Sequence, residues 1–89
     1  MASSFQTKII KEYEGEGWYV INLIKTNKNG IPDLLCIKAG HKPIFIECKE
    51  WNDTLKPLQK FRIKELLDYG VDAVCIKDKK NKKKPIKVW

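Results

Sequence analysis

Apolar residues recur every three or four positions in residues 3–16, which is the spacing of one face of a helix. Ser3 and Gln6 have the spacing of a capping box at the start of this segment, and Gly15 and Gly17 end it. The pattern predicts an amphipathic helix. Its apolar stripe consists of Phe5, Ile9, Ile10 and Tyr13.

A second segment with helical spacing begins at about Leu55 or Pro57 and runs to Tyr69. Gly70 follows as a stop signal, because glycine readily adopts the backbone conformation that ends a helix. The residues expected to be buried from this helix are Leu58, Phe61, Leu66 and Tyr69 or its neighbours.

The remaining apolar runs are short, rich in β-branched residues and bounded by turn residues, so they predict strands. The four main strands are expected at Trp18–Lys25, Leu34–Lys38, Ile44–Lys49 and Val71–Lys77, and residues 85–89 form a short edge strand. The order is α-β-β-β-α-β. We therefore expect an α/β domain over residues 1–89, with a small mixed sheet and flanking helices.

The second and third strands are separated only by the turn-forming residues 39–43, which predicts a hairpin. A three-residue loop would pair Ala39 with Pro43. In that register, Asp33 lies opposite Lys49 and Leu35 lies opposite Glu47. Asp33 and Glu47 would then be diagonal neighbours with a backbone separation of roughly 7–8 Å. That separation allows both carboxylates to hold one metal ion.

Side chains alternate between the two faces of a strand, so Phe45, Glu47 and Lys49 share one face. The other face is filled by Ile44, Ile46 and Cys48. Two acids and a lysine on one face of a small sheet are costly unless they bind something. Taken singly, Asp33 is also compatible with a turn residue, and Glu47 with Lys49 is compatible with an exposed strand pair worth about 0–1 kcal/mol.

The 89 residues carry a formal net charge of +7, which favours an anionic partner, with nucleic acid first and an acidic membrane second. No apolar run is long enough to span a bilayer, and no secretory signal is recognised. Three cysteines in apolar runs favour reduced thiols in the cytoplasm. The small size and several aromatic residues favour a homo-oligomer.

Lysines concentrate in two loops that flank the acid pair in sequence, and we expect them to contact DNA phosphates. The alternative is that the second cluster is a solvated turn protecting an edge strand. The lysines concerned are Lys25, Lys28, Lys79, Lys80, Lys82, Lys83 and Lys84.

Three motifs occur together in a fixed order: GIPD at 30–33, ECK at 47–49, and Gln59 in the following helix. This combination resembles the PD-(D/E)XK nuclease superfamily, and within it the VRR-NUC branch, in particular its short stand-alone phage-type members. The resemblance covers nearly the whole chain, from Gln6 to about Lys77. The ECK element alone is a weak signal, and its order with the other motifs makes the pattern specific.

The resemblance implies a restriction-endonuclease-like core and metal-dependent hydrolysis of DNA phosphodiester bonds. For small members it implies a homodimer acting on branched DNA such as Holliday junctions, in the cytoplasm of a bacterium or of a phage-infected host. Asp33, Glu47 and the Cys48 carbonyl would bind Mg²⁺ or Mn²⁺. Lys49 would orient the attacking water or stabilise charge on the phosphate. Gln59 would lie at the edge of the site and bond Lys49 or the DNA backbone.

Relatives usually carry a glutamate early in the first helix, where this chain has the sequence SSFQ. Three alternatives are open: Gln6 substitutes through water, Glu12 or Glu14 approaches, or the site works with two acids. The missing glutamate leaves a second class of function, a DNA-binding module without turnover. A third is a subunit that acts on RNA or in a restriction system. Trp51 is placed either to stack on a base or to pack at a dimer contact.

Overall fold

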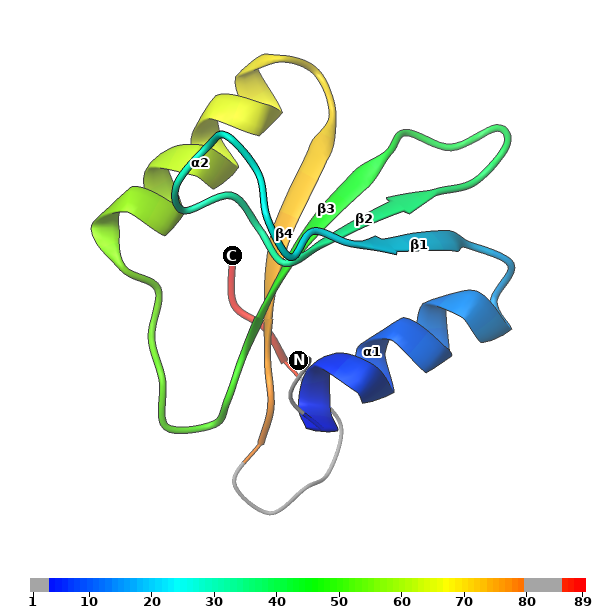
Figure 1. Cartoon of the computed structure of the whole chain (residues 1–89), viewed down its shortest axis with the longest axis horizontal. Helices are drawn as coiled ribbons and strands as arrows, with labels where there is room; N and C mark the ends of the chain where they lie inside the picture. Colours follow the sequence, from blue (N-terminus) through cyan, green and yellow to red (C-terminus); the bar gives the residue numbers. More distant parts are fainter. Residues whose placement is uncertain (1–3, 80–85) are drawn as a thin grey trace.

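The computed structural model describes residues 4–79 and 86–89 (Figure 1). These residues follow the expected order α-β-β-β-α-β, and a short final strand follows. The elements are α1 (Ser4–Gly15), β1 (Tyr19–Asn22), β2 (Leu34–Ile37), β3 (Ile44–Lys49), α2 (Pro57–Asp68), β4 (Asp72–Lys77) and β5 (Ile86–Lys87). The predicted fold class is confirmed. Ser3 and the lysines Lys80, Lys82, Lys83 and Lys84 lie outside the described residues.

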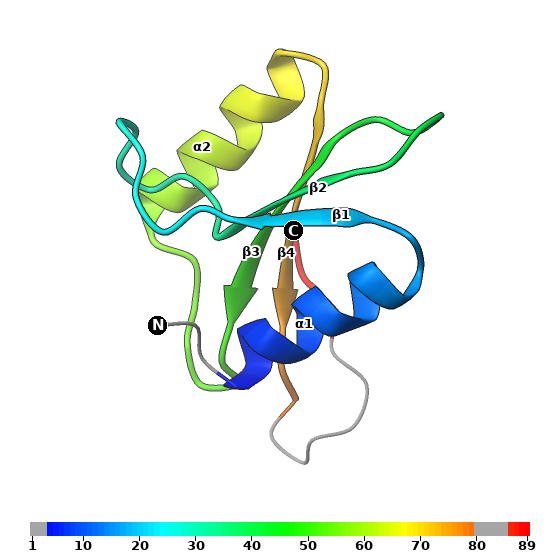
Figure 2. The same ribbon diagram turned by 45° about the vertical axis from the view of Figure 1, so that its right-hand side comes forward.

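The strands form one mixed sheet in the order β1-β2-β3-β4-β5. Antiparallel pairing joins β1 to β2, β2 to β3 and β4 to β5, whereas β3 and β4 are parallel. A parallel pair cannot be joined by a tight turn, so α2 forms the crossover between β3 and β4. Figure 2 shows this connection, in which the chain leaves the end of β3, passes through α2 and returns along β4.

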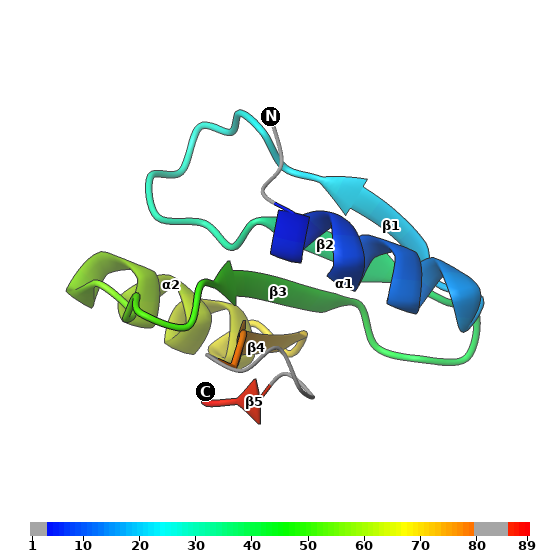
Figure 3. The ribbon, with the colours of Figure 1, turned by 90° about the horizontal axis from the view of Figure 1, so that it is seen from below.

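Helix α1 covers one face of the sheet with the predicted stripe. Phe5 and Ile9 are buried against Leu34, Cys36 and Ile46. Around this cluster, the half-buried members Ile10 and Tyr13 complete the stripe. Helix α1 contacts β1 and β3, whereas α2 contacts β4, and in the view from below the two helices lie over different parts of the sheet (Figure 3).

Helix α2 covers the opposite face, but the expected buried set was partly wrong. Ile63 is fully buried with Ala73 and Cys75, and Leu66 is half-buried beside them. Phe61 and Tyr69 are 55% and 84% exposed. Gln59, Ile63 and Leu66 have the spacing of one helix face, and this face is turned toward the sheet. The remaining apolar residues of the helix therefore point outward. Leu58 is also largely exposed.

The predicted hairpin forms, but its expected register is wrong by two residues. Leu35 pairs with Phe45 and not with Glu47. The last pair before the turn is Cys36 with Ile44, and the connection contacts the turn after α1, where Lys38 Nζ donates to the Glu16 carbonyl at 2.7 Å. A shift of two residues keeps every side chain on its predicted face. Glu47 and Lys49 therefore still face α2.

The strand expected at Trp18–Lys25 is shorter and ends at Asn22. Residues 23–33 form the loop that carries the GIPD motif. Neither helix in the described ranges is long and apolar enough to cross a bilayer.

Candidate active site

The loop before β2 is fixed to the start of α2, and this attachment aims Asp33 at β3. Gly30 has φ +79°, and a β-carbon there would lie 2.7 Å from Leu58 Cγ, so only glycine fits without displacing the helix side chain. Arg62 Nε donates to the Asn29 carbonyl at 2.8 Å. Pro32, which follows, is fully buried. The GIPD motif therefore forms a short, rigid segment that positions the Asp33 carboxylate.

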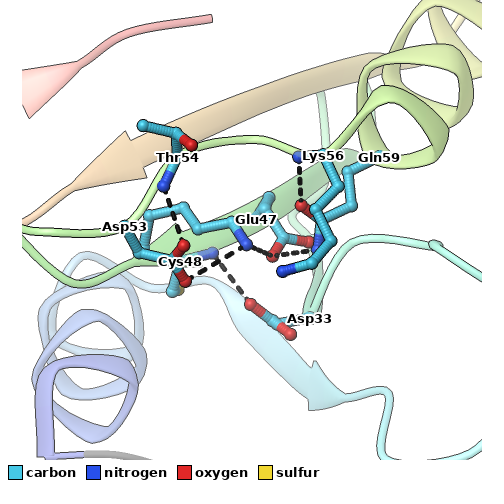
Figure 4. A network of polar contacts seen from close by, with 8 residues as sticks. Asp33, Glu47, Cys48, Asp53, Thr54, Lys56 and Gln59 are labelled. Atoms are coloured by element: carbon cyan, nitrogen blue, oxygen red, sulfur yellow. Dashed lines mark hydrogen bonds and ion pairs between the residues drawn. The ribbon is translucent and has the colours of Figure 1, made fainter.

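Asp33 lies directly across from Glu47, one step beyond the Leu34–Ile46 pair of the β2–β3 ladder. This places the two acids closer than the diagonal arrangement expected from the sequence. The Cys48 backbone N–H donates to Asp33 Oδ2 at 2.9 Å (Figure 4). Glu47 is only 4% exposed. The two carboxyl groups therefore share one small, largely dry space.

This environment changes the acidity of both groups. Burial, and then the charge of Asp33, raises the pKa of Glu47 to about 8, although Lys49 opposes the shift. Burial also raises the pKa of Asp33, with the Cys48 N–H bond as the largest opposing effect. Two adjacent carboxylates cannot both ionise cheaply without a counter-charge. At neutral pH the pair therefore holds a proton unless a cation replaces it.

Lys49 lies beside this pair and is only 6% exposed. Its Nζ is 3.7 Å from Glu47 Oε2 and 3.6 Å from Asp53 Oδ2. Asp53 is held in turn by the Thr54 backbone N–H, which donates to Oδ1 at 2.8 Å. The Thr54 N–H and then Lys49 lower the pKa of the Asp53 carboxyl, so it stays ionised.

Asp53 was missed by sequence reasoning. It belongs to no motif, and its only signal is a position four residues after Lys49 in a polar connection. The structure shows its effect: Lys49 lies between the buried carboxyl group of Glu47 and the half-exposed carboxylate of Asp53.

Gln59 reaches the same space from the first turn of α2. Its Nε2 donates to Glu47 Oε2 at 3.3 Å, while its Oε1 accepts the Lys56 backbone N–H at 2.9 Å. The Gln59 side chain therefore caps the start of α2 and also orients Glu47 (Figure 4). Sequence reasoning placed Gln59 at the edge of the site but gave it Lys49 as its protein partner, whereas the observed partner is Glu47.

The first helix adds no third acid. Gln6 Nε2 donates to Asn22 Oδ1 at 3.1 Å, and Asn22 pairs with Leu34, the residue after Asp33. Gln6 therefore lies over the same end of the sheet as the acid pair. Glu12 and Glu14 are exposed further along α1. Among residues 4–79 and 86–89, no group of three or more His, Cys, Asp or Glu side chains is placed to hold a metal ion.

The flanking lysines are only partly described. Lys25 and Lys28 are exposed on the loop that leads to Asp33, and Thr26 Oγ1 accepts the Lys28 N–H at 3.2 Å. Lys79 is half-buried directly after β4. Trp51, just after β3, is 41% exposed. Cys36 and Cys75 are buried free thiols, and burial raises the pKa of each to about 11.

The fold is that of the PD-(D/E)XK nucleases. Residues 4–78 match the model of the VRR-NUC domain, so the chain belongs to the VRR-NUC family of nucleases, as predicted. No match was found among curated proteins.

Two solved structures show the same fold. A protein described as a VRR_NUC domain is 24% identical with a TM-score of 0.71, over 84% of this chain and 81% of that chain. Hjc from Archaeoglobus fulgidus, a Holliday junction resolvase from an archaeal hyperthermophile, is 17% identical with a TM-score of 0.68. That match covers 92% of this chain and 74% of Hjc.

Proposed function

We propose that this VRR-NUC nuclease is a metal-dependent DNA endonuclease that hydrolyses phosphodiester bonds in branched DNA, including Holliday junctions, as a homodimer. The observation that carries the proposal is the cross-strand pair of half-buried Asp33 and buried Glu47, with Lys49 Nζ 3.7 Å from Glu47 Oε2. Two adjacent acids, one of them buried, are an unfavourable arrangement unless a cation in addition to Lys49 neutralises them.

The donor set fits Mg²⁺ or Mn²⁺. These ions prefer oxygen ligands and keep several waters, so two carboxylates and one backbone carbonyl form a sufficient protein contribution. Asp33 and Glu47 would be the side-chain ligands, and the carbonyl of Cys48 would be the third. A divalent ion bound there supplies charge neutralisation at the phosphate and a bound water of lowered pKa.

Lys49 and Gln59 supply a positive charge and an amide hydrogen-bond donor, which the two acids cannot provide. Lys49 places a positive charge beside Glu47, where it would orient the attacking water or stabilise charge that develops on the phosphate. Asp53 holds the lysine from its other side. Gln59 fixes the orientation of Glu47 through its amide, so the carboxylate does not have to reorganise when substrate binds. Gln6 would act as an auxiliary residue through water.

Charge and exposure support the proposed partners. The net charge of +7 and the exposed Lys25 and Lys28 favour the DNA backbone, and we extend this role to Lys79, Lys80, Lys82, Lys83 and Lys84. The fold shared with Hjc, itself described as a Holliday junction resolvase, supports branched DNA. The exposed Phe61 on α2 and the exposed Tyr69 just after it support self-association. The free thiols fit action in the reducing cytoplasm.

The test is incubation with supercoiled plasmid and with a synthetic four-way junction, in Mg²⁺, Mn²⁺ or EDTA. We expect cleavage of the junction with either metal and none in EDTA. Asp33→Asn should be inactive, whereas Asp68→Asn, an exposed aspartate at the end of α2, should match the wild type. Metal-independent cleavage, or full activity of Asp33→Asn, would overturn the proposal.

One observation favours a second candidate, a DNA-binding module with the nuclease fold but little turnover. Where relatives usually carry a glutamate in the first helix, this chain has Gln6, which is bonded to Asn22. If the wild type binds the junction tightly without cutting it, and Gln6→Glu cuts it, the second candidate is correct. Cleavage by the wild type excludes it.

A further inference from the structure

A cavity of about 330 Å³ begins at Lys49 and extends away from the acid pair. It is bounded by the connection from β3 to α2, the first turns of α2, and β4 with the segment after β5. Figure 1 shows that this last segment runs beside β4 on the side of α2. Apart from Lys49, the residues that line the cavity belong to none of the motifs found in the sequence.

The walls of the cavity are held by backbone pairing. Val88 N–H donates to the Cys75 carbonyl at 2.9 Å, and Cys75 N–H donates to the Trp89 carbonyl at 2.9 Å. Leu55, on the opposite side, packs against the buried cluster under α2. Lys77 is the cross-strand partner of Lys49 in the parallel β3–β4 pair. The cavity is therefore built from fixed elements.

Its chemistry combines cations with apolar surface. Lys49, Lys60 and Lys77 contribute positive charge, and Asp53 is the single acid among the lining side chains. Leu55, Val88 and Trp89 provide the apolar wall. Lysines that neutralise phosphates beside an aromatic residue that accepts a base are the combination by which proteins bind single-stranded nucleic acid.

We propose that this cavity, which we call the nucleotide pocket, binds one unpaired DNA nucleotide adjacent to the phosphate that is cleaved. Its volume lies at the lower end of the range for small-ligand sites. It suits a single nucleotide, not a base pair. Trp89 contacts the base, and Lys60 and Lys77 contact the flanking phosphates. The inference rests on the proposed function, because Lys49 is both the end of the pocket and the residue assigned to the scissile phosphate.

An unpaired nucleotide is available at a branch point or a flap but not within a continuous duplex. Extruding a paired base costs a few kcal/mol, and that cost is smallest where the base is already unpaired. The nucleotide pocket therefore gives a preference for branched over continuous DNA that depends on structure and not on base sequence.

The test measures binding of a fluorescein-labelled tetranucleotide, dT4, by anisotropy in EDTA, so that no cleavage is needed. Trp89→Ala should weaken binding by roughly 10-fold, in the range measured when one base loses its aromatic partner, and Trp89→Phe should restore it to within about 2-fold. Tyr19→Ala is the control, since Tyr19 is an exposed aromatic residue on β1 and lies outside the pocket. It should bind like the wild type.

A second pair of variants keeps the test informative if Trp89→Ala does not fold. Lys60→Ala should weaken dT4 binding several-fold, whereas Lys64→Ala, one turn later on α2 and outside the pocket, should not. Equal losses from the two lysine variants, or from Tyr19→Ala and Trp89→Ala, would overturn the pocket, as would unchanged binding by Trp89→Ala.

The same measurement separates this inference from the proposed function. Asp33→Asn, which should not cleave, should bind dT4 like the wild type. If the wild type cleaves junctions but Trp89→Ala and Lys60→Ala bind dT4 normally, only the pocket is wrong. If the wild type binds dT4 through these residues but never cleaves, only the proposed cleavage is wrong.

Discussion

The two faces of the sheet have different roles, although strand β3 contributes to both. On the α1 face, β3 contributes Ile44, Ile46 and Cys48 to an apolar cluster. On the α2 face, the intervening residues include Glu47 and Lys49, both almost fully buried. Alternation along one strand therefore separates a stabilising core from a charged site.

The difference has an energetic consequence. Burying apolar side chains on the α1 face stabilises the fold by roughly 25 cal/mol per Å² of area removed from water. Burying carboxyl groups on the α2 face costs free energy, and the raised pKa of Glu47 shows that part of this cost is avoided by holding a proton. Substitution of Lys49 should therefore act mainly on chemistry, whereas substitutions in the apolar cluster on the α1 face should act on stability.

The largest expected effect is on the α2 face. Lys49→Ala should lower the single-turnover cleavage rate by roughly 10²–10⁴-fold, because it removes a charge that acts mainly in the transition state. Affinity for the DNA junction should stay within a few-fold of the wild type. Lys42→Ala, in the exposed hairpin loop, is the control and should leave both quantities unchanged. If affinity collapses and the rate on bound DNA persists, Lys49 is a phosphate anchor.

The corresponding change on the α1 face is Ile46→Ala. Ile46 is fully buried, so the substitution should lower the free energy of unfolding by about 2–5 kcal/mol through reduced burial and a residual cavity. Urea unfolding measures the loss. Ile37→Ala, at a 41% exposed position on β2, should cost much less. Similar losses at the two positions would contradict the assignment of Ile46 to a buried apolar cluster on the α1 face.

The acid pair should also make stability depend on pH when no metal is present. The folded protein holds a proton on Glu47 up to a pKa of about 8, whereas the unfolded chain releases it near 4.5. The folded state binds more protons in that window, so the free energy of unfolding should fall as pH rises from about 4.5 to 8, by roughly 2–5 kcal/mol.

Urea unfolding in EDTA at several pH values tests this dependence. Glu47→Gln should flatten it and should be more stable than the wild type at pH 8. Glu12→Gln, at an exposed position on α1, should leave it unchanged. A wild-type stability that rises through the same window would show that Glu47 is ionised in the folded, metal-free protein.

The smallest expected effect concerns the lysines beside the GIPD loop. The double variant Lys25→Ala with Lys28→Ala should reduce the slope of log affinity against log salt by up to about 2, roughly 0.9 for each DNA phosphate that is no longer neutralised. Lys8→Ala with Lys11→Ala, on the exposed side of α1, changes the net charge equally and should affect the slope less. Equal slopes for the two double variants would mean that Lys25 and Lys28 act only through net charge.

The sequence predicted the order of the elements and the face of each site residue because both depend on local periodicity. The hairpin register did not follow from the sequence. It depends on tertiary contacts, in which Lys38 bonds the Glu16 carbonyl and the rings of Trp18 and His41 lie 5.3 Å apart. Since the shift was even, Glu47 kept its face and came closer to Asp33.

The place of Asp53 beside Lys49 and the exposed face of α2 could not be predicted either, because both depend on tertiary contacts. The position of Asp53 near Lys49 depends on a loop conformation fixed by the Thr54 N–H, and no pattern in the sequence encodes that contact. Helix α2 has apolar residues on several sides, so its buried stripe is decided by the strands it covers. Gly30 shows the reverse case. The GIPD motif was recognised from the sequence, and the close approach to Leu58 explains why its first residue is glycine.

The central claim, that Asp33 and Glu47 share one divalent ion, is tested most directly by calorimetric titration of Mn²⁺ into the protein without DNA. The wild type should bind one ion at this site and release protons as it does so, because the metal replaces the proton held by the pair. Asp33→Asn and Glu47→Gln should abolish this binding, and Asp68→Asn should not. Undiminished Mn²⁺ binding by both Asp33→Asn and Glu47→Gln would contradict the claim.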